Sequence, residues 1–204
     1  MIRALARFIL FIAGWTAVGG APSVPKAVYI AAPHTSNWDG IWALTFKVAV
    51  GIDVKFFAKD SWFWFPLDIL LRALGGIPLN RSRANSAVSR AVEMFATHDS
   101  FYFGLAPEGT RSLRDGWKTG FYRIAIEANV PIYLGFLDYP SKRVGVGARL
   151  DPTGDMEADL KVCADFYAGI EARWPEKASP VRFSQAKKTA PKGGFPDETD
   201  SSDR

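Results

Sequence analysis

The stretch AVYIAAPHTSNWDG, residues 27–40, contains a strand, a turn and the start of a helix. Ala27–Ala32 is an uninterrupted apolar run, which is typical of a strand buried on both faces. A helix is predicted near Trp38–Val50, and either Ser36 or Asn37 can cap its first turn. A strand followed at once by a helix is the repeating unit of layered α/β proteins, so this stretch indicates the fold class.

The rest of the chain repeats this alternation of strands and helices. Further strands are predicted at Val54–Ala58, at GGIPL, at Phe101–Leu105, at Pro131–Leu137 and, as an edge strand, at Val144–Ala148. Further helices are predicted at Trp64–Leu74, Ala84–Thr97, Thr119–Ala128 and Met156–Trp174. We therefore expect an α/β domain with a mainly parallel central sheet that is flanked by helices.

Composition excludes several classes of protein. The net charge is +4, but lysine and arginine are scattered along the chain, so we expect no nucleic-acid partner. A single cysteine, Cys163, excludes an intrachain disulfide and is expected to be a small core residue. With only two histidines, His34 and His98, we expect no metal site, and His98 is expected to cap the end of a helix.

Residues 1–20 (MIRALARFILFIAGWTAVGG) begin with Arg3 and Arg7, followed by the uncharged run Phe8–Val18. The run is short for a membrane-spanning helix. A secretory signal and a buried core helix are alternatives, and we favour a helix in the membrane interface with its arginines near the headgroups. The aromatic segment Phe56–Phe65 suits either a bilayer interface or a well-filled core.

The turn after the first strand places His34 and Asp39 where they can interact. Asp39 falls in the first helical turn, and it can reach back to one ring nitrogen of His34. The carboxylate would fix the tautomer and stabilise the imidazolium, which makes His34 a competent general base near neutral pH. Alternatives are a capped helix with a surface histidine, and a hydrolase with Ser36 as nucleophile, although no nucleophile elbow surrounds Ser36.

Four segments, in this order, resemble the motifs of the glycerolipid acyltransferase family, which includes the lysophosphatidic acid acyltransferases. The segments are HTSNWD (34–39), AKDSWFWFP with LGGIPLNRS (58–66 and 74–82), APEGTRS (106–112) and WKTGFYRIAIEANVPIYLG (117–135). The likeness extends over about half of the chain. Departures at Pro33, Asn80, Leu105-Ala106 and Leu134 concern the identity of the acceptor more than the reaction.

The resemblance implies a catalytic role for His34 and Asp39. It also implies that Arg81, Glu108, Gly109 and Thr110 bind the acceptor, together with Lys59 and Arg111. Guanidinium groups bind phosphate in a bidentate manner, which suits Arg81 and Arg111. Glu108 could hold a glycerol hydroxyl or one of these arginines, and the alternative for Arg111 is an ion pair with Glu108 that only joins two loops.

We therefore expect an O-acyltransferase that needs no cofactor and no metal. Its donor would be acyl-CoA or acyl-carrier protein, and its acceptor a lysophospholipid such as a 1-acylglycerol-3-phosphate, in phospholipid biosynthesis. Alternatives are an alcohol acceptor of another kind, such as a glycolipid or lyso-aminolipid, and a non-catalytic lipid-binding protein. The expected organisation is a membrane-associating helix (1–20), an acyltransferase domain (21–174) and a disordered tail (175–204), on the cytoplasmic face of a membrane.

Overall fold

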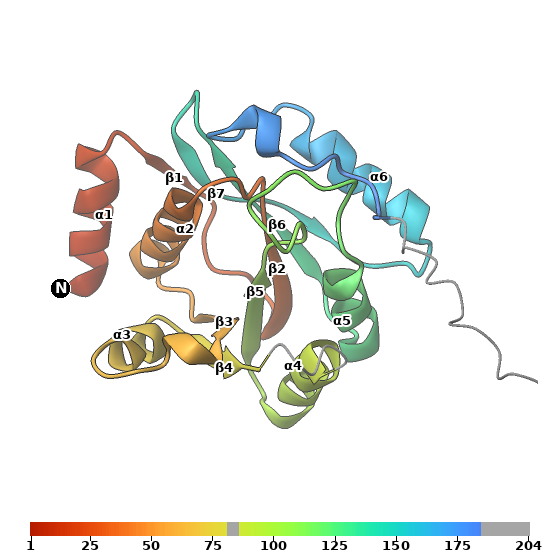
Figure 1. Cartoon of the computed structure of the whole chain (residues 1–204), viewed down its shortest axis with the longest axis horizontal. Helices are drawn as coiled ribbons and strands as arrows, with labels where there is room; N and C mark the ends of the chain where they lie inside the picture. The colour runs from red at the N-terminus through yellow and green to blue at the C-terminus, as the bar shows by residue number, and fades with distance from the viewer. Residues whose placement is uncertain (81–85, 185–204) are drawn as a thin grey trace, which may run out of the picture.

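The computed structural model describes residues 1–80 and 86–184, which form a single mostly parallel sheet with helices on both faces (Figure 1). Across the sheet the seven strands are β1 (Thr16–Val18), β7 (Arg143–Leu150), β6 (Ile132–Asp138), β2 (Lys26–Ala32), β5 (Phe101–Leu105), β3 (Val54–Lys59) and β4 (Gly76–Leu79). Only β6 and β7 pair antiparallel. The α/β fold with a mainly parallel sheet is therefore confirmed.

Six α-helices are described: α1 (Ile2–Ile12), α2 (Asn37–Val50), α3 (Leu67–Ala73), α4 (Ser86–Thr97), α5 (Gly120–Ala128) and α6 (Met156–Tyr167). Helices α4, α5 and α6 cover one face of the sheet, where Phe95, Phe121 and the predicted core residue Cys163 are buried against β2, β5 and β6. On the other face, α2 lies between the sheet and α1 (Figure 1). Burial on both faces explains the continuous apolar run of β2.

Strand and helix boundaries differ from expectation mainly near the chain ends. The sequence did not indicate β1, a three-residue strand that pairs with β7 at the edge of the sheet. Because β1 covers it, β7 is an internal strand rather than the predicted edge strand. The predicted closing helix Met156–Trp174 ends at Tyr167, and the residues after it run as loop and a short 3-10 helix, Pro175–Lys177.

The N-terminal segment forms a helix that is shorter than predicted. Helix α1 ends at Ile12, and residues 16–18 belong to the sheet, so the boundary expected at residue 20 is wrong. One side of α1 is buried through Ala6 and Leu10, so the helix is neither wholly core nor wholly free. Among the described residues, every helix is too short or too polar to cross a bilayer.

The two arginines of α1 are exposed, and each also contacts the end of α2. The Nε of Arg7 donates to the backbone oxygen of Ala49, in the last turn of α2, at 3.0 Å. The guanidinium group of Arg3 lies against Gly51, which ends α2 with a positive φ of 79°. A cation at a helix C-terminus is stabilised by the helix dipole. These arginines therefore join α1 to α2, and their position near headgroups stays a prediction.

Residues 175–184, which belong to the segment expected to be disordered, make defined contacts, and residues 185–204 lie outside the described residues. The backbone N–H of Ser184 donates to the carbonyl of Trp117 at 2.8 Å, and Trp117 forms a bridge with Phe183. The side chain of Arg182 donates to the backbone oxygen of Asp115 at 2.6 Å. We call residues 168–184 the C-terminal strap, because they cross the carboxyl edge of the sheet. The predicted start of the tail at residue 175 is therefore wrong.

Candidate active site

The turn between β2 and α2 is held by a network around one carboxylate. Ser36 is the N-cap of α2, and its Oγ accepts from the backbone of Trp38 at 3.2 Å. The Oδ2 of Asp39 accepts from the backbone N–H groups of Thr35 and Ser36, each at 2.7 Å. This capping box satisfies N–H groups that a helix start otherwise leaves unpaired. It also turns Asp39 back toward the residues that precede the helix.

His34 lies next to this carboxylate. Its Nδ1 is 3.4 Å from the Oδ2 of Asp39, and its side chain is 25% exposed, whereas that of Asp39 is 2% exposed. The contact expected from the sequence is therefore present. With Nδ1 directed at Asp39, the ring presents Nε2 for an incoming hydroxyl, which is the arrangement of a general base with its orienting carboxylate.

A third residue, Tyr139, completes the surroundings of Asp39. Its hydroxyl donates to the Oδ1 of Asp39 at 2.6 Å, from the loop that follows β6. Burial acts to raise the pKa of Asp39, but the surrounding donors, foremost His34 and Tyr139, outweigh burial and lower the pKa. Burial, followed by this hydrogen bond, raises the pKa of Tyr139, which stays a neutral donor. Asp39 is thus held as a carboxylate beside the imidazole.

Glu108 lies beneath the site and is only 1% exposed. Its Oε1 accepts from the backbone N–H of His34 at 2.6 Å, and its Oε2 accepts from the backbone N–H of Ser179 at 3.2 Å. Burial raises the pKa of this carboxyl, and the two hydrogen bonds oppose that shift. The carboxylate of Glu108 therefore holds the backbone of His34, and its predicted contact with the acceptor stays a prediction.

A largely apolar cavity of about 660 Å³ opens at this edge of the sheet. His34 and Asp39 line it, as do Gly109, Thr110, Arg111 and Lys59 of the predicted acceptor site. From the histidine it continues between α2 and the sheet, past Ala43 and Leu44. Since the carboxyl ends of parallel strands are where α/β proteins bind ligands, the cavity is the candidate substrate site.

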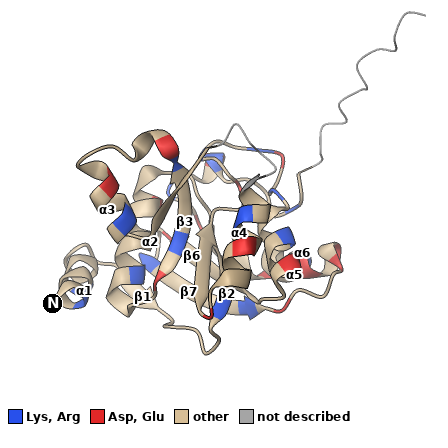
Figure 2. Ribbon diagram, turned by 90° about the horizontal axis from the view of Figure 1, so that it is seen from below, with Lys and Arg blue, Asp and Glu red and all other residues tan. Residues whose placement is uncertain are grey.

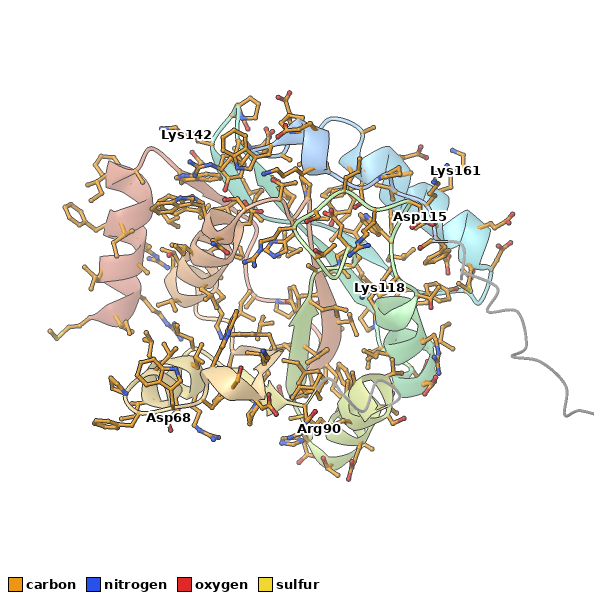
Figure 3. All side chains as sticks on the ribbon, in the orientation of Figure 1. Asp68, Arg90, Asp115, Lys118, Lys142 and Lys161 are labelled. Carbon is orange, nitrogen blue, oxygen red and sulfur yellow. The ribbon has the colours of Figure 1, made fainter. Side chains whose placement is uncertain are left out.

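Cationic side chains gather at the mouth of the cavity. The guanidinium of Arg111 donates to the side-chain oxygen of Asn37 in the first turn of α2. The ammonium of Lys118 lies beside Gly109, whose φ of 66° favours glycine. Lys118 is labelled in Figure 3, on the loop before α5. Arg81 lies outside the described residues. Elsewhere the basic residues are dispersed over several elements (Figure 2).

Sequence reasoning missed the residues that reach the site from the distant end of the chain. The backbone N–H of Trp174 donates to the Oγ1 of Thr35 at 3.3 Å. Arg173 lies over the ring of Tyr139, 6.0 Å from its centroid. Neither Tyr139 nor the C-terminal strap carries a recognisable motif. Within the described part of the chain, no three His, Cys, Asp or Glu side chains gather closely enough to hold a metal ion.

The protein is thus an α/β protein with a histidine–carboxylate pair at an apolar cavity. Such a pair suits proton transfer, and such a cavity suits a lipid-like ligand. The family model described as Acyltransferase matches residues 17–133, and the chain belongs to this acyltransferase family. No curated protein sequence matches the chain. The chain is therefore an acyltransferase by family, and the expected family is confirmed.

A solved structure shares the fold. It is described as the crystal structure of the 1-acyl-sn-glycerophosphate (LPA) acyltransferase, PlsC, from Thermotoga maritima. The similarity has a TM-score of 0.61, covers 85% of this chain and 79% of that chain, and has 19% sequence identity. At this identity the comparison concerns the fold alone. The roles of the individual site residues therefore stay predictions.

Proposed function

We propose that this protein transfers a fatty acyl group from acyl-CoA or acyl-carrier protein to a hydroxyl of a lysophospholipid, in phospholipid biosynthesis. The observation that carries the proposal is the His34–Asp39 pair at the mouth of an apolar cavity. The thioester would lie at the mouth with its acyl chain in the cavity. Both donors are cytoplasmic, so the cytoplasmic face of a membrane is the proposed location.

The reaction follows from the positions of these two residues. Nε2 of His34 removes the proton from the acceptor hydroxyl, and the oxygen attacks the thioester carbonyl carbon. When the C–S bond breaks, the thiolate takes the proton from the imidazolium, and an ester and a free thiol are the products. Asp39 stabilises the imidazolium between these steps. The acyl group passes directly between substrates, and no cofactor takes part.

A phosphate on the acceptor would suit the charges at the cavity mouth. Arg111, Lys59 and Lys118 all lie there, and a charge-assisted hydrogen bond contributes about 1.5–3 kcal/mol. Because Arg111 is exposed, we expect Arg111→Ala to raise the acceptor KM by about tenfold, the lower end of that range, with the donor KM little changed. Steady-state kinetics with lysophosphatidic acid measure this effect.

Comparing acyl transfer to lysophosphatidic acid with transfer to monoacylglycerol shows whether the protein recognises the phosphate of the acceptor. The parent protein should prefer lysophosphatidic acid, and Arg111→Ala should lose much of that preference. Arg114→Ala is the matched control, because Arg114 is exposed on the same loop but does not line the cavity. Arg81→Ala extends the test to the predicted second arginine. A parent protein with no preference for the phosphate would favour a glycolipid or lyso-aminolipid acceptor, and no transfer to any acceptor would favour a lipid-binding protein.

We also propose that the protein binds a lipid bilayer through α1 and the region around α3. Apolar side chains are exposed on α1, including Phe8, Phe11 and Ile12. A second exposed group lies around α3 and contains Trp62, Trp64, Phe65, Ile69 and Leu70. Both helices lie at the same end of the molecule in Figures 1 and 2, and side chains of α1 point away from the protein in Figure 3. Exposed aromatic side chains favour a bilayer interface.

The expected result is sedimentation with phospholipid vesicles. Since burial of apolar side chains drives it, high salt should release little protein. Replacing both Phe8 and Phe11 with serine should weaken binding by roughly two to four orders of magnitude, because each buried phenylalanine contributes on the order of 1.5–3 kcal/mol. Val162→Ser on α6 is the control, because Val162 is exposed but lies on another helix. Equal sedimentation of all three proteins would contradict the proposal.

A further inference from the structure

Two polar side chains, those of Lys47 and Tyr29, belong to the wall of the largely apolar cavity. Lys47 follows Asp39 and Ala43 at intervals of four residues on one face of α2, about 12 Å from Asp39 along the helix axis. Its ammonium donates to the backbone oxygens of Val54 at 2.6 Å and Leu74 at 2.8 Å. Lys47 lines the cavity and is nearly buried.

Tyr29 of β2 also lines this part of the cavity and is only 7% exposed. Its hydroxyl is buried and has no hydrogen-bond partner among the residues that the structure describes. The ring itself is held firmly, stacked on Tyr133 at 5.3 Å and edge-on to Tyr102 at 5.9 Å. Burial raises the pKa of Tyr29, so the phenol keeps its proton and stays a donor in need of an acceptor.

An unpaired buried hydroxyl is costly, and Tyr29 belongs to the cavity wall, so a ligand that brings an acceptor to this part of the wall would relieve that cost. An acyl chain that ends in a methyl group would leave Tyr29 unpaired. A chain that carries an oxygen at this depth would accept a hydrogen bond from Tyr29. Lys47 reinforces the preference, since an ammonium has three donors and two are used by backbone oxygens.

We propose that Tyr29 and Lys47 form a distal polar subsite that selects acyl chains bearing an oxygen substituent, such as a hydroxyl, near their far end. The subsite also disfavours unsubstituted chains long enough to reach it. This inference rests on the proposed function, because it takes the cavity as the site of the acyl chain. It adds a ligand class that the apolar walls alone would not predict.

Direct binding tests the subsite without turnover. The probes are S-alkyl phosphopantetheine thioethers, which cannot transfer an acyl group, with alkyl chains from octyl to octadecyl that end in either a methyl or a hydroxyl group. Titration calorimetry with the full chain measures each dissociation constant. Affinity for methyl-ended chains should rise with length and then stop rising. At that length, the hydroxyl-ended chain should bind about tenfold more tightly than its methyl-ended partner.

Tyr29→Phe removes a single oxygen atom and should abolish this hydroxyl advantage. Its thermal stability should equal or exceed that of the parent, because the lost hydroxyl has no partner in the described structure. Tyr102→Phe is the matched control, since its hydroxyl donates to the backbone of Val24 at 2.8 Å and does not line the cavity. The control should keep the advantage of the hydroxyl-ended chain.

Three results would overturn the subsite: no binding of any thioether, equal binding of both chain types at every length, or a hydroxyl advantage that survives in Tyr29→Phe. A separate assay with acyl-CoA and lyso-acceptors tests the proposed function. A hydroxyl advantage without acyl transfer would keep the subsite and reject the enzyme activity. Acyl transfer without tighter binding of hydroxyl-ended chains would keep the enzyme activity and reject the subsite.

Discussion

Replacing His34 with alanine should lower the rate of acyl transfer by roughly two to four orders of magnitude, the range that general acid–base catalysis contributes. The loss should appear in kcat, because the imidazole acts on the reacting hydroxyl rather than on the bound chain. The fold should survive the substitution. The structural hydrogen bond of residue 34 is made by its backbone N–H to Glu108, and alanine keeps that group. Single-turnover rates and circular dichroism measure the two effects.

The only other histidine provides the matched control. His98 lies beyond the end of α4, where its Nδ1 is 2.9 Å from the backbone oxygen of Met94. It is exposed and lies outside the cavity that contains His34. His98→Ala should therefore change kcat by less than about twofold, because a surface substitution of this kind alters little. Near-parental turnover in a folded His34→Ala protein would reject the mechanism.

Replacing Asp39 with asparagine should lower kcat roughly a hundredfold or more, since the general-base contribution depends on the carboxylate. A neutral amide stabilises the imidazolium less than a carboxylate does. The side chain also has two oxygens that accept hydrogen bonds, from backbone N–H groups on one side and from Tyr139 on the other. Asparagine can place only one oxygen there, so a loss of stability of about 1–3 kcal/mol should accompany the loss of rate.

Tyr139→Phe separates the effect of the Asp39 charge on catalysis from the effect of its hydrogen bonds on stability. It removes one donor from the carboxylate and leaves the charge in place, so we expect a loss in kcat of only about tenfold or less. A carboxylate with one donor fewer stabilises the imidazolium more strongly, so the acidic limb of the pH–rate profile should move to higher pH. A purely structural tyrosine would lower stability without moving that limb. Rates measured across the pH range distinguish the two roles.

Local patterns sufficed to predict the contact between His34 and Asp39, because its geometry is local. Ser36 caps α2 and Asp39 lies in the first turn of that helix, so five residues of chain bring the carboxylate back to His34. The strands of the inner sheet were likewise evident from their apolar runs, since a strand buried on both faces leaves that composition wherever it occurs. Resemblance to the family motifs then identified the reaction class, which the family match confirms.

Short or mixed segments misled the same reasoning. β1 is only three residues long, and no periodicity can be read from so few. Helix α1 ends at Ile12, although the apolar run continues to Val18, because residues 16–18 pair with β7 instead. The polar residues after Trp174 have the composition of a disordered tail, yet backbone hydrogen bonds to Trp117 and Glu108 order them up to residue 184. Backbone hydrogen bonds of this kind cannot be predicted from amino-acid composition.

The chain by itself therefore specified the α/β class, the family and the pair His34 and Asp39, all of which depend on neighbours in sequence. Only the tertiary structure showed which distant residues contact His34 and Asp39. Tyr139 reaches Asp39 from 100 positions away, and Glu108 reaches the backbone of His34 from 74 positions away. In the folded protein Glu108 accepts a hydrogen bond from the backbone of His34, and its contact with the acceptor stays a prediction. Whether a carboxylate meets substrate or backbone depends on its depth in the packed protein, and packing is a property of the whole chain.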